Sequence, residues 1–306
     1  MGALFDNSIG LLERLGDPSL ALDGPSRTYV VLGAVVQAMP EADRQALFEL
    51  LLDRKYSLNN LAKCTFLLGF AAERSGMIPQ HELGQQQGEG WGLLGHLFDP
   101  SLGIETSTRA LLLLGAITEH NGYAPEQVLQ ILQDQDWAMG NADKAVLLLV
   151  AAALQPKLAI DAGTFLGGSA SALSMFAERV ITIDIDPARA QNVEHLPNVD
   201  FLSGIASDVL AELLPTTPAA ELVVLDASHT CNGIQAEVEQ LLSNPPSCLR
   251  AVLIHDSAME TCRAGLDLID WAAYPLVRSF TLDFLPGVEN EEGVMGGGLA
   301  VVWLLE

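Results

Sequence analysis

Hydrophobic and polar residues follow two different patterns in this chain, one up to residue 138 and another from residue 141. In the first part, apolar residues recur at the spacing of amphipathic helices. The polar stretch 80–92 interrupts this pattern and is predicted to be a loop, and its part around 85–90 could serve as a lid. Helices are predicted over 26–39, 40–52, 57–73, 106–119 and 125–135.

From residue 141, a helix through residue 154 is followed by short apolar runs that alternate with helices. Buried parallel strands have such continuous apolar runs, and the last two runs are expected to form an antiparallel pair at an edge. We therefore predict an α/β fold: a Rossmann-like, seven-stranded, mostly parallel sheet with helices on both faces, preceded by an all-α N-terminal domain. The domains are expected at 1–138 and 139–306. The predicted strands are 158–161, 180–184, 199–202, 221–226, 250–255, 278–284 and 298–304.

The composition narrows the kinds of partner. The net charge is −24, whereas phosphate binding needs a basic face, so neither nucleic acid nor an anionic membrane is an expected partner. The four cysteines include no CxxC pair, which argues against a disulfide framework or a zinc site. The longest apolar run, 145–154, is too short to cross a bilayer, and the N-terminus has no basic leader before an apolar core. A cytoplasmic protein is expected.

The segment 157–187 has the pattern of a strand, a glycine-rich turn, a helix and a second strand. In such a βαβ unit, nucleotide-like ligands bind at the turn. A dinucleotide fingerprint needs GxG, which the turn lacks, and a P-loop needs Lys and then Ser/Thr where Ser169 and Ala170 stand. Ser169 is expected to cap the helix instead. The pattern that remains is D-x-G-x-x-x-G-x-S, at Asp161, Gly163, Gly167 and Ser169.

With this turn, and with Asp184 after the second strand, residues 141–306 resemble the class I S-adenosylmethionine-dependent methyltransferases. The resemblance implies that the turn wraps the methionine part of S-adenosylmethionine, that Asp184 holds both ribose hydroxyls, and that 204–208 contacts adenine. A carboxylate can accept two hydroxyl donors and attracts a sulfonium cation, so the chemistry agrees. The residues expected to bind the cofactor are Asp161, Gly163, Thr164, Gly167, Ser169, Asp184, Ile185, Ser207 and Asp226.

Acids and histidines follow the fourth and fifth predicted strands. Asp226 and His229 come after the fourth, and His255 and Asp256 come after the fifth. Because these loops are neighbours in a doubly wound sheet, the side chains could converge. Two carboxylates flanking a cleft could hold Mg²⁺, although either could instead cap a helix or bond backbone amides.

The same residues resemble the magnesium-dependent bacterial O-methyltransferases that act on sugars of natural products. In that family an Asp-x-x-His, matched here by Asp226 and His229, supplies a metal ligand and a base. The family's Glu-Asp pair is His255-Asp256 here, and imidazole favours a softer ion than Mg²⁺. The resemblance therefore implies His229 as the catalytic base and Asp226, His255 and Asp256 as metal ligands. His229 could alternatively be a structural residue bonded to Asp226.

The function expected from the sequence is methyl transfer from S-adenosylmethionine to a hydroxyl of a small molecule, assisted by a divalent cation, Mg²⁺. Two alternatives stay open: a metal-independent N- or C-methyltransferase, and a non-catalytic S-adenosylmethionine-binding protein that acts through its helical domain. That domain is expected to form a homo-oligomer and to cover the acceptor pocket. Aromatic candidates for the cover are Trp91, Tyr123 and Trp137.

Overall fold

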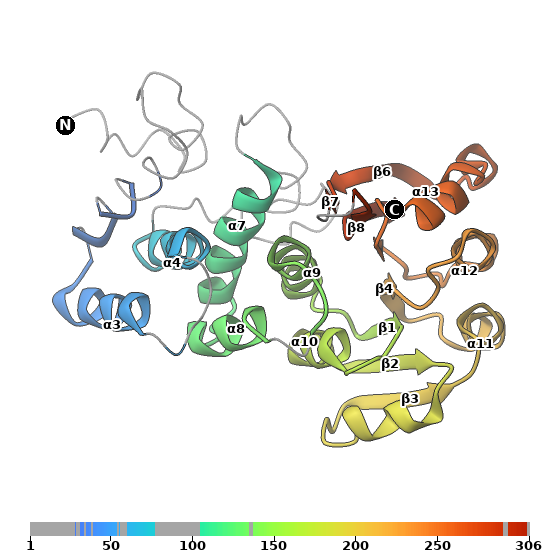
Figure 1. The fold of residues 1–306 in the computed structure, drawn as a ribbon. Coiled ribbons are helices and arrows are strands. Elements are labelled where there is room, and N and C mark those ends of the chain that lie inside the picture. Colours follow the sequence, from blue (N-terminus) through green and yellow to red (C-terminus); the bar gives the residue numbers. More distant parts are fainter. Residues whose placement is uncertain are drawn as a thin grey trace. The chain divides into compact units, whose positions relative to one another are not determined.

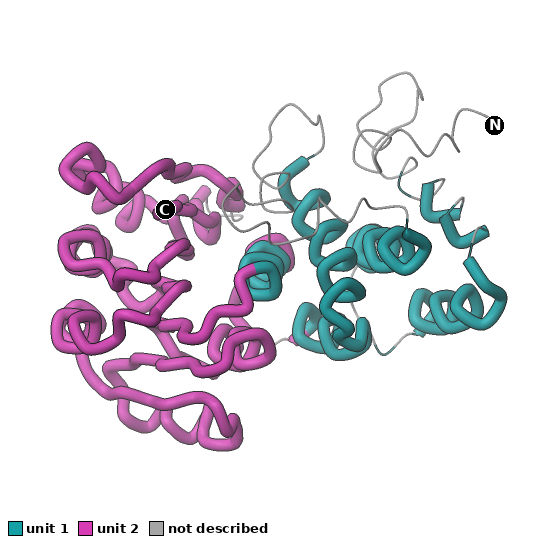
Figure 2. Tube along the Cα trace, turned by 180° about the vertical axis from the view of Figure 1, so that it is seen from behind, with its two compact units in different colours: residues 1–133, 144–153 teal, residues 134–143, 154–306 magenta. Residues whose placement is uncertain are grey.

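The chain folds into two compact units, coloured separately in Figure 2. Unit 1 comprises residues 1–133 and 144–153, and unit 2 comprises 134–143 and 154–306. The predicted boundary at 138/139 falls within 134–143, a stretch that belongs to unit 2. The computed structural model describes residues 28, 31–33, 35–37, 39–53, 55, 60–76, 105–134, 137–289 and 293–304.

The described part of unit 1 is helical (Figure 1). Helices α4 (Asn60–Arg74) and α7 (Thr106–His120) pack closely where glycine leaves room for the other backbone. A Cβ at Gly69 would collide with the carbonyl oxygen of Leu112, and one at Gly115 with that of Phe66. Of the predicted helix 26–39, residues 28, 31–33 and 35–37 are described and helical, whereas the predicted loop 80–92, with Trp91, lies outside the described residues. The helices are α3 (Glu41–Leu52), α4 (Asn60–Arg74), α7 (Thr106–His120), α8 (Pro125–Leu132) and α9 (Asn141–Leu154), which continues from unit 2 into unit 1.

Unit 2 contains a seven-stranded sheet in the order β3-β2-β1-β4-β5-β9-β6. Strands β1 to β5 are parallel, and β9 runs antiparallel to both of its neighbours, β5 and β6. This arrangement confirms the predicted α/β fold. The strands are β1 (Leu158–Ala162), β2 (Arg179–Asp184), β3 (Val199–Ser203), β4 (Ala220–Leu225), β5 (Ala251–His255), β6 (Val277–Leu285) and β9 (Leu299–Leu304).

The last two strands pair antiparallel as predicted, but only β6 lies at the edge. Strand β9 is inserted between β5 and β6, which explains why all six of its residues are buried. A separate two-stranded ribbon, β7 (Val288–Glu289) with β8 (Met295–Gly296), was not predicted. Both of its strands contain only two residues, too few for a periodic pattern.

Helices cover both faces of this sheet. Helix α10 (Gly168–Phe176) packs on β1 and β2, and α11 (Ala206–Leu213), α12 (Cys231–Ser243) and α13 (Glu260–Asp267) lie in a row on the other side (Figure 1). The strand order reverses between β1 and β4, so the loops after these strands diverge and leave a crevice at the carboxyl ends. None of the helices formed by described residues is long and apolar enough to cross a membrane.

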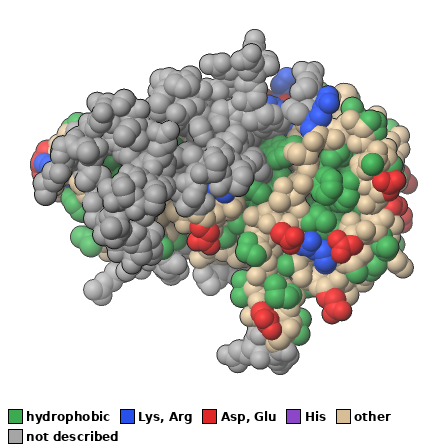
Figure 3. Space-filling model, turned by 90° about the horizontal axis from the view of Figure 1, so that it is seen from above, with side chains coloured by type: hydrophobic (Ala, Val, Ile, Leu, Met, Phe, Trp, Pro, Cys, Tyr) green, Lys and Arg blue, Asp and Glu red, His purple; other side chains and the backbone are tan. Residues whose placement is uncertain are grey.

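Charged side chains are mixed on the described surface. On the face drawn in Figure 3, the described basic side chains are scattered, and acidic side chains lie on both sides of the basic group near the right centre. Ion pairs of the described surface include those of Arg179 with Asp200 and of Arg189 with Asp186.

Candidate functional site

A cavity of about 390 Å³ opens at the carboxyl ends of the parallel strands in unit 2. This volume falls in the range of small-molecule sites. Seven residues predicted to act in binding or catalysis line it: Gly163, Asp184, Ile185, Asp226, His229, His255 and Asp256. Gly204, Ile205 and Ala206, from the segment 204–208 that was expected to contact adenine, line it as well. The lining residues that sequence reasoning did not assign to a site are Ala138, Phe165, Ala227, Ser228 and Glu237.

The glycine turn after β1 is shaped by the neighbouring strands. The amides of Gly163 and Thr164 both donate to the carbonyl of Ile183, which lies in β2. Gly163 has φ +113°, and a Cβ there would collide with the carbonyl oxygen of Asp226 after β4. The residue must therefore be glycine on two grounds, conformation and space. The turn thereby brings the ends of β1, β2 and β4 together.

A row of hydrogen-bonded, buried side chains connects β1, the glycine turn and β2. The hydroxyl of Thr182 donates to Asp161 at 2.8 Å and lies 2.7 Å from the hydroxyl of Thr164. Burial raises the pKa of Asp161 to about 7, the hydroxyls of Thr182 and Ser169 oppose the rise, and the charges of Asp226 and Asp184 add to it. Asp161, Thr164, Gly167, Ser169 and Ser207, although predicted to bind the cofactor, are not among the residues that line the cavity.

The predicted helix cap at Ser169 is wrong. Helix α10 begins at Gly168, its N-cap is Gly167 with φ +87°, and no side chain caps it. Ser169 lies inside the first turn and is 4% exposed. Its hydroxyl lies close enough to lower the pKa of Asp161, so tertiary neighbours rather than the helix end hold it.

Asp184 ends β2 at the cavity wall. Its Oδ2 accepts a hydrogen bond from the amide of Phe165, and its Oδ1 accepts one from the amide of Asp186, each at 2.9 Å. Each carboxylate oxygen has a second lone pair that can accept a further donor. Next to it, Ile185 is 68% exposed, and Ile205 after β3 is 55% exposed. The cavity wall thus offers oriented acceptors beside aliphatic surface.

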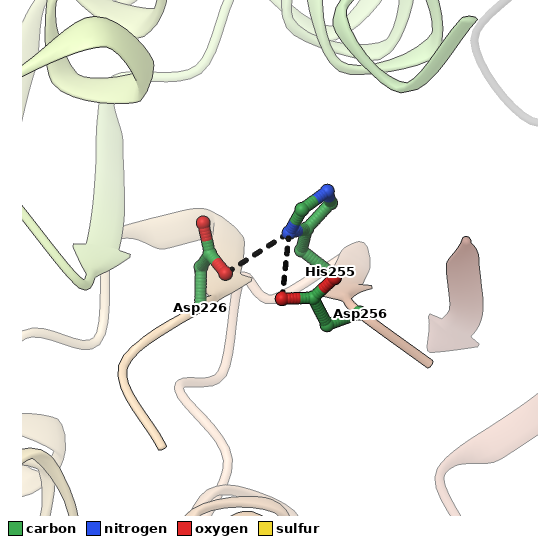
Figure 4. A group of neighbouring side chains, drawn as sticks. All are labelled: Asp226, His255 and Asp256. Atoms are coloured by element: carbon green, nitrogen blue, oxygen red, sulfur yellow. Dashed lines mark hydrogen bonds and ion pairs between the residues drawn. The ribbon is translucent and has the colours of Figure 1, made fainter. Parts of the chain in front are cut away.

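Four acidic and imidazole side chains meet at the ends of β4 and β5. Three of them are drawn in Figure 4, where His255 lies between Asp226 and Asp256. Nδ1 of His255 is 3.0 Å from Asp226 Oδ1 and 3.7 Å from Asp256 Oδ2. Nε2 of His229 lies 3.4 Å and 3.3 Å from the same two oxygens. The sequence prediction that these loops converge is therefore confirmed for the side chains themselves.

The fifth member of the cluster, Asp143, comes from a distant part of the sequence. Its Oδ2 lies 3.6 Å from Nε2 of His255, which is ion-pair distance but longer than a hydrogen bond. Asp143 stands near the start of α9, and sequence reasoning gave it no site role. The sequence shows an acid just before the apolar run 145–154, which could have suggested a site residue. Acids are common in the first turn of a helix, however, because they interact favourably with the helix dipole.

The charges of the cluster set the protonation of its members. Burial lowers the pKa of His255, but the nearby carboxylate of Asp143, the hydrogen bond with Asp226 and the charges of Asp226 and Asp256 outweigh it and raise the pKa to about 10. Hydrogen bonding to Asp226 raises the pKa of His229. Burial raises the pKa of Asp226, yet its hydrogen bonds with His229 and His255 lower it overall. His255 is therefore a buried cation held among carboxylates.

Backbone contacts fix Asp256 and His229 in place. Asp256 has φ +54°, an uncommon conformation for a residue with a side chain, and its Oδ1 accepts a hydrogen bond of 2.8 Å from the amide of Gly297. The hydroxyl of Thr261 donates to the carbonyl of His229 at 2.7 Å. His229 is thus anchored through its backbone, and it is one of the residues that line the cavity.

The predicted metal ligands lie together, but they do not fit Mg²⁺. Ligand atoms of Asp226, His255 and Asp256 all lie within 4.8 Å of one another. Mg²⁺ prefers six oxygen ligands, whereas one of these three atoms is an imidazole nitrogen. Nδ1 of His255 lies 3.0 Å from Asp226 Oδ1, and the carboxylates around the ring raise the pKa of His255, which favours the protonated imidazole over a metal ligand. The cluster already contains its own cation.

The aromatic residues proposed for an acceptor cover have other surroundings. Trp137 is 4% exposed, and a Cβ at Gly168 would collide with it, so its ring lies against the start of α10. Tyr123 lies in unit 1, where it lines a second cavity together with Arg74 and Glu119.

Comparison with known proteins gives weak similarities only. No family model matches the chain, and no curated protein matches it in sequence. Among solved structures, a proposed O-methyltransferase from Klebsiella pneumoniae is 16% identical, with 60% of this chain and 91% of that one covered and a TM-score of 0.43.

Two further solved structures were crystallised with ligands. An O-methyltransferase from Bacillus cereus in complex with SAH is 20% identical, with 58% and 89% of the two chains covered and a TM-score of 0.42. An O-methyltransferase of tomaymycin synthesis from Streptomyces achromogenes, in complex with SAM, is 17% identical, with 59% and 89% covered and a TM-score of 0.43. Similarities of this size do not establish an activity, and the fold of this chain rests on its own strand order.

Proposed function

We propose that this protein transfers a methyl group from S-adenosylmethionine to a hydroxyl group of a small molecule. One observation carries the proposal: a single cavity at the carboxyl ends of the strands is lined both by Asp184, with free acceptor capacity, and by the histidine–carboxylate pair His229 and Asp226. The first can bind a ribose, and the second can remove a proton. Sugars and related natural products are the acceptor class that we infer from the resemblance.

The residues around the turn fit the cofactor. The carboxylate of Asp184 can accept both ribose hydroxyls while keeping its two backbone hydrogen bonds. Ile185 and Ile205 offer aliphatic surface for a flat ring. The acidic side chains that line the cavity favour a cation, and S-adenosylmethionine supplies an electrophilic methyl group on a positively charged sulfur when bound.

His229 is the proposed base. Its Nε2 faces Asp226 and Asp256, so the N–H is on that nitrogen and Nδ1 keeps a lone pair. As the new carbon–oxygen bond forms and the sulfur–carbon bond breaks, the hydroxyl proton of the acceptor passes to Nδ1. The two carboxylates stabilise the imidazolium that results, in the manner of other acid-oriented histidine bases.

Ligand binding tests this proposal directly. We expect calorimetry to detect binding of S-adenosylhomocysteine, the product, and Asp184→Asn to weaken it about 10- to 100-fold, because a charged acceptor of two hydroxyls is lost. Asp200→Asn is the matched control, because Asp200 is an exposed acid on β3 that pairs with Arg179 outside the cavity. If the wild-type protein binds neither S-adenosylmethionine nor S-adenosylhomocysteine, the proposal is wrong.

Metal removal tests the part played by the cluster. Because His255 already supplies a cation between Asp226 and Asp143, we expect EDTA to leave turnover unchanged and added Mg²⁺ to have no effect. The measurement is product formation by mass spectrometry over a panel of hydroxylated small molecules, after metal has been stripped and then restored. Turnover that depends on Mg²⁺ would show instead that the metal displaces a proton from His255.

Two other functions use the same residues. A metal-independent N- or C-methyltransferase would need the same cofactor site and the same base, and the position of the new methyl group in the product distinguishes it. A non-catalytic binding protein would bind S-adenosylhomocysteine but modify no acceptor. The arrangement of His229 between two carboxylates favours an enzyme, since a binding site alone has no need of an oriented base.

A further inference from the structure

Helix α12 buries a carboxylic acid in the face on which every other buried residue is apolar. The helix turns Ile234, Val238, Leu241 and Leu242 inward, and Glu237 stands among them with 3% of its surface exposed. Its Oε2 makes no hydrogen bond with any residue that the structure describes. A buried polar atom without a partner is unfavourable, so a ligand that supplies the partner would remove this penalty.

Glu237 is one of the residues that line the cavity of the proposed active site. Glu237 lines it together with 204–206, the segment that leads from β3 into α11. Helices α11 and α12 are neighbours and pack against each other (Figure 1). Ile185 and Ile205, whose side chains are exposed, line the same cavity. The lining therefore combines aliphatic surface with one desolvated acid.

When it is protonated, the carboxyl of Glu237 suits a ligand that presents a hydrogen-bond donor next to an acceptor. Burial, with the charge of Asp226 as a second cause, raises the pKa of this carboxyl to about 7, while His229 opposes the rise. A carboxyl that is protonated offers one O–H donor and one acceptor side by side. The edge of adenine that carries its amino group presents a donor next to a ring nitrogen that accepts. Aliphatic surface beside such a pair suits a flat, amino-bearing heterocycle.

We propose that Glu237 recognises the amino edge of the adenine ring and so selects an adenosyl ligand for this site. The inference rests on the proposed function, because it assigns a specificity-determining residue to the cofactor named there. Its role is in recognition and not in the transfer of the methyl group.

The test combines a change in the ligand with a change in the protein. The ligands are S-adenosylhomocysteine and its analogue that lacks the amino group on the purine. We expect the wild-type protein to bind the analogue about 10- to 100-fold more weakly by calorimetry. Glu237→Leu should bind both ligands with equal affinity, because the group that distinguishes them is gone. Glu237→Gln should keep the preference, since an amide carries the same donor and acceptor.

The control is Glu239→Leu, which changes an acid on the same helix that bonds Gln235 and does not line the cavity. It should leave both affinities as in the wild type. Equal affinity of the wild type for the two ligands would overturn the inference without any variant, and so would a preference that survives in Glu237→Leu. Either result leaves the proposed function standing, whereas failure of S-adenosylhomocysteine to bind at all would overturn both.

Discussion

Replacing His229 by alanine is expected to lower turnover by about 10²- to 10⁴-fold, the usual contribution of a general base. The imidazole lies 3.4 Å from Asp226 and 3.3 Å from Asp256. His255 lies near the same two carboxylates but is buried, whereas the side chain of His229 is exposed at the cavity and can accept the proton of the acceptor. The affinity for S-adenosylhomocysteine should stay within about twofold of the wild type, because the base acts on the acceptor and not on the cofactor. Turnover is measured by mass spectrometry and affinity by calorimetry.

His195→Ala is the control for this experiment. His195 is an exposed histidine that does not line the cavity, so its removal should change neither turnover nor affinity. A His229→Ala variant that turns over at a near-normal rate would refute the assignment of the base. Loss of both turnover and cofactor affinity would indicate that His229 holds the loop after β4 in shape instead, as the contact between its carbonyl and Thr261 allows.

The second large effect concerns stability and Asp161. Burial raises the pKa of this fully buried carboxyl from 3.8 to about 7. Between these values the folded state binds more protons than the unfolded state, so stability falls as pH rises. The contribution is complete below about pH 4 and is lost as pH passes through 7. The pKa difference corresponds to a change on the order of 4 kcal/mol.

Asp161→Asn should remove this dependence, because an amide does not ionise. We expect the free energy of unfolding of the wild type, taken relative to that of the variant, to decrease from about pH 4 to about pH 8 by the amount above. Urea unfolding followed by circular dichroism measures it. Asp200→Asn should run parallel to the wild type, because its carboxyl is exposed. If the free energies of unfolding of the wild type and of Asp161→Asn also change in parallel with pH, the carboxyl of Asp161 ionises in the folded protein without loss of stability, and the prediction is wrong.

Much of the fold could be predicted because its signals are local. Continuous apolar runs gave β1, β4 and β5 within one residue at each end, since strands that are buried on both faces need apolar residues at every position. The position of β9 could not be predicted in this way. Whether a final apolar strand lies at the edge or between β5 and β6 depends on which neighbour offers unpaired backbone groups, and the sequence of that strand is the same in both cases.

The residues of the candidate site also fall into those that could be predicted from the local sequence and those that could not. Asp184, Asp226, His229, His255 and Asp256 follow strand ends, and the rule that such loops meet was enough to bring them together. Asp143 and Glu237 follow no strand. Asp143 has the sequence context of an ordinary helix start, and Glu237 that of one acid in an amphipathic helix, so only the packed structure identifies them.

The sequence by itself determined the order of elements, the glycine turn and the acids at the ends of the strands, because each depends on residues close together in the chain. The tertiary structure alone decided how these groups are charged and what they can bind. His255 lies between Asp143 and Asp226, and Glu237 lies inside an apolar wall. Protonation and metal affinity depend on burial and on charges a few ångströms away, and the residues that supply those charges are far apart in the sequence.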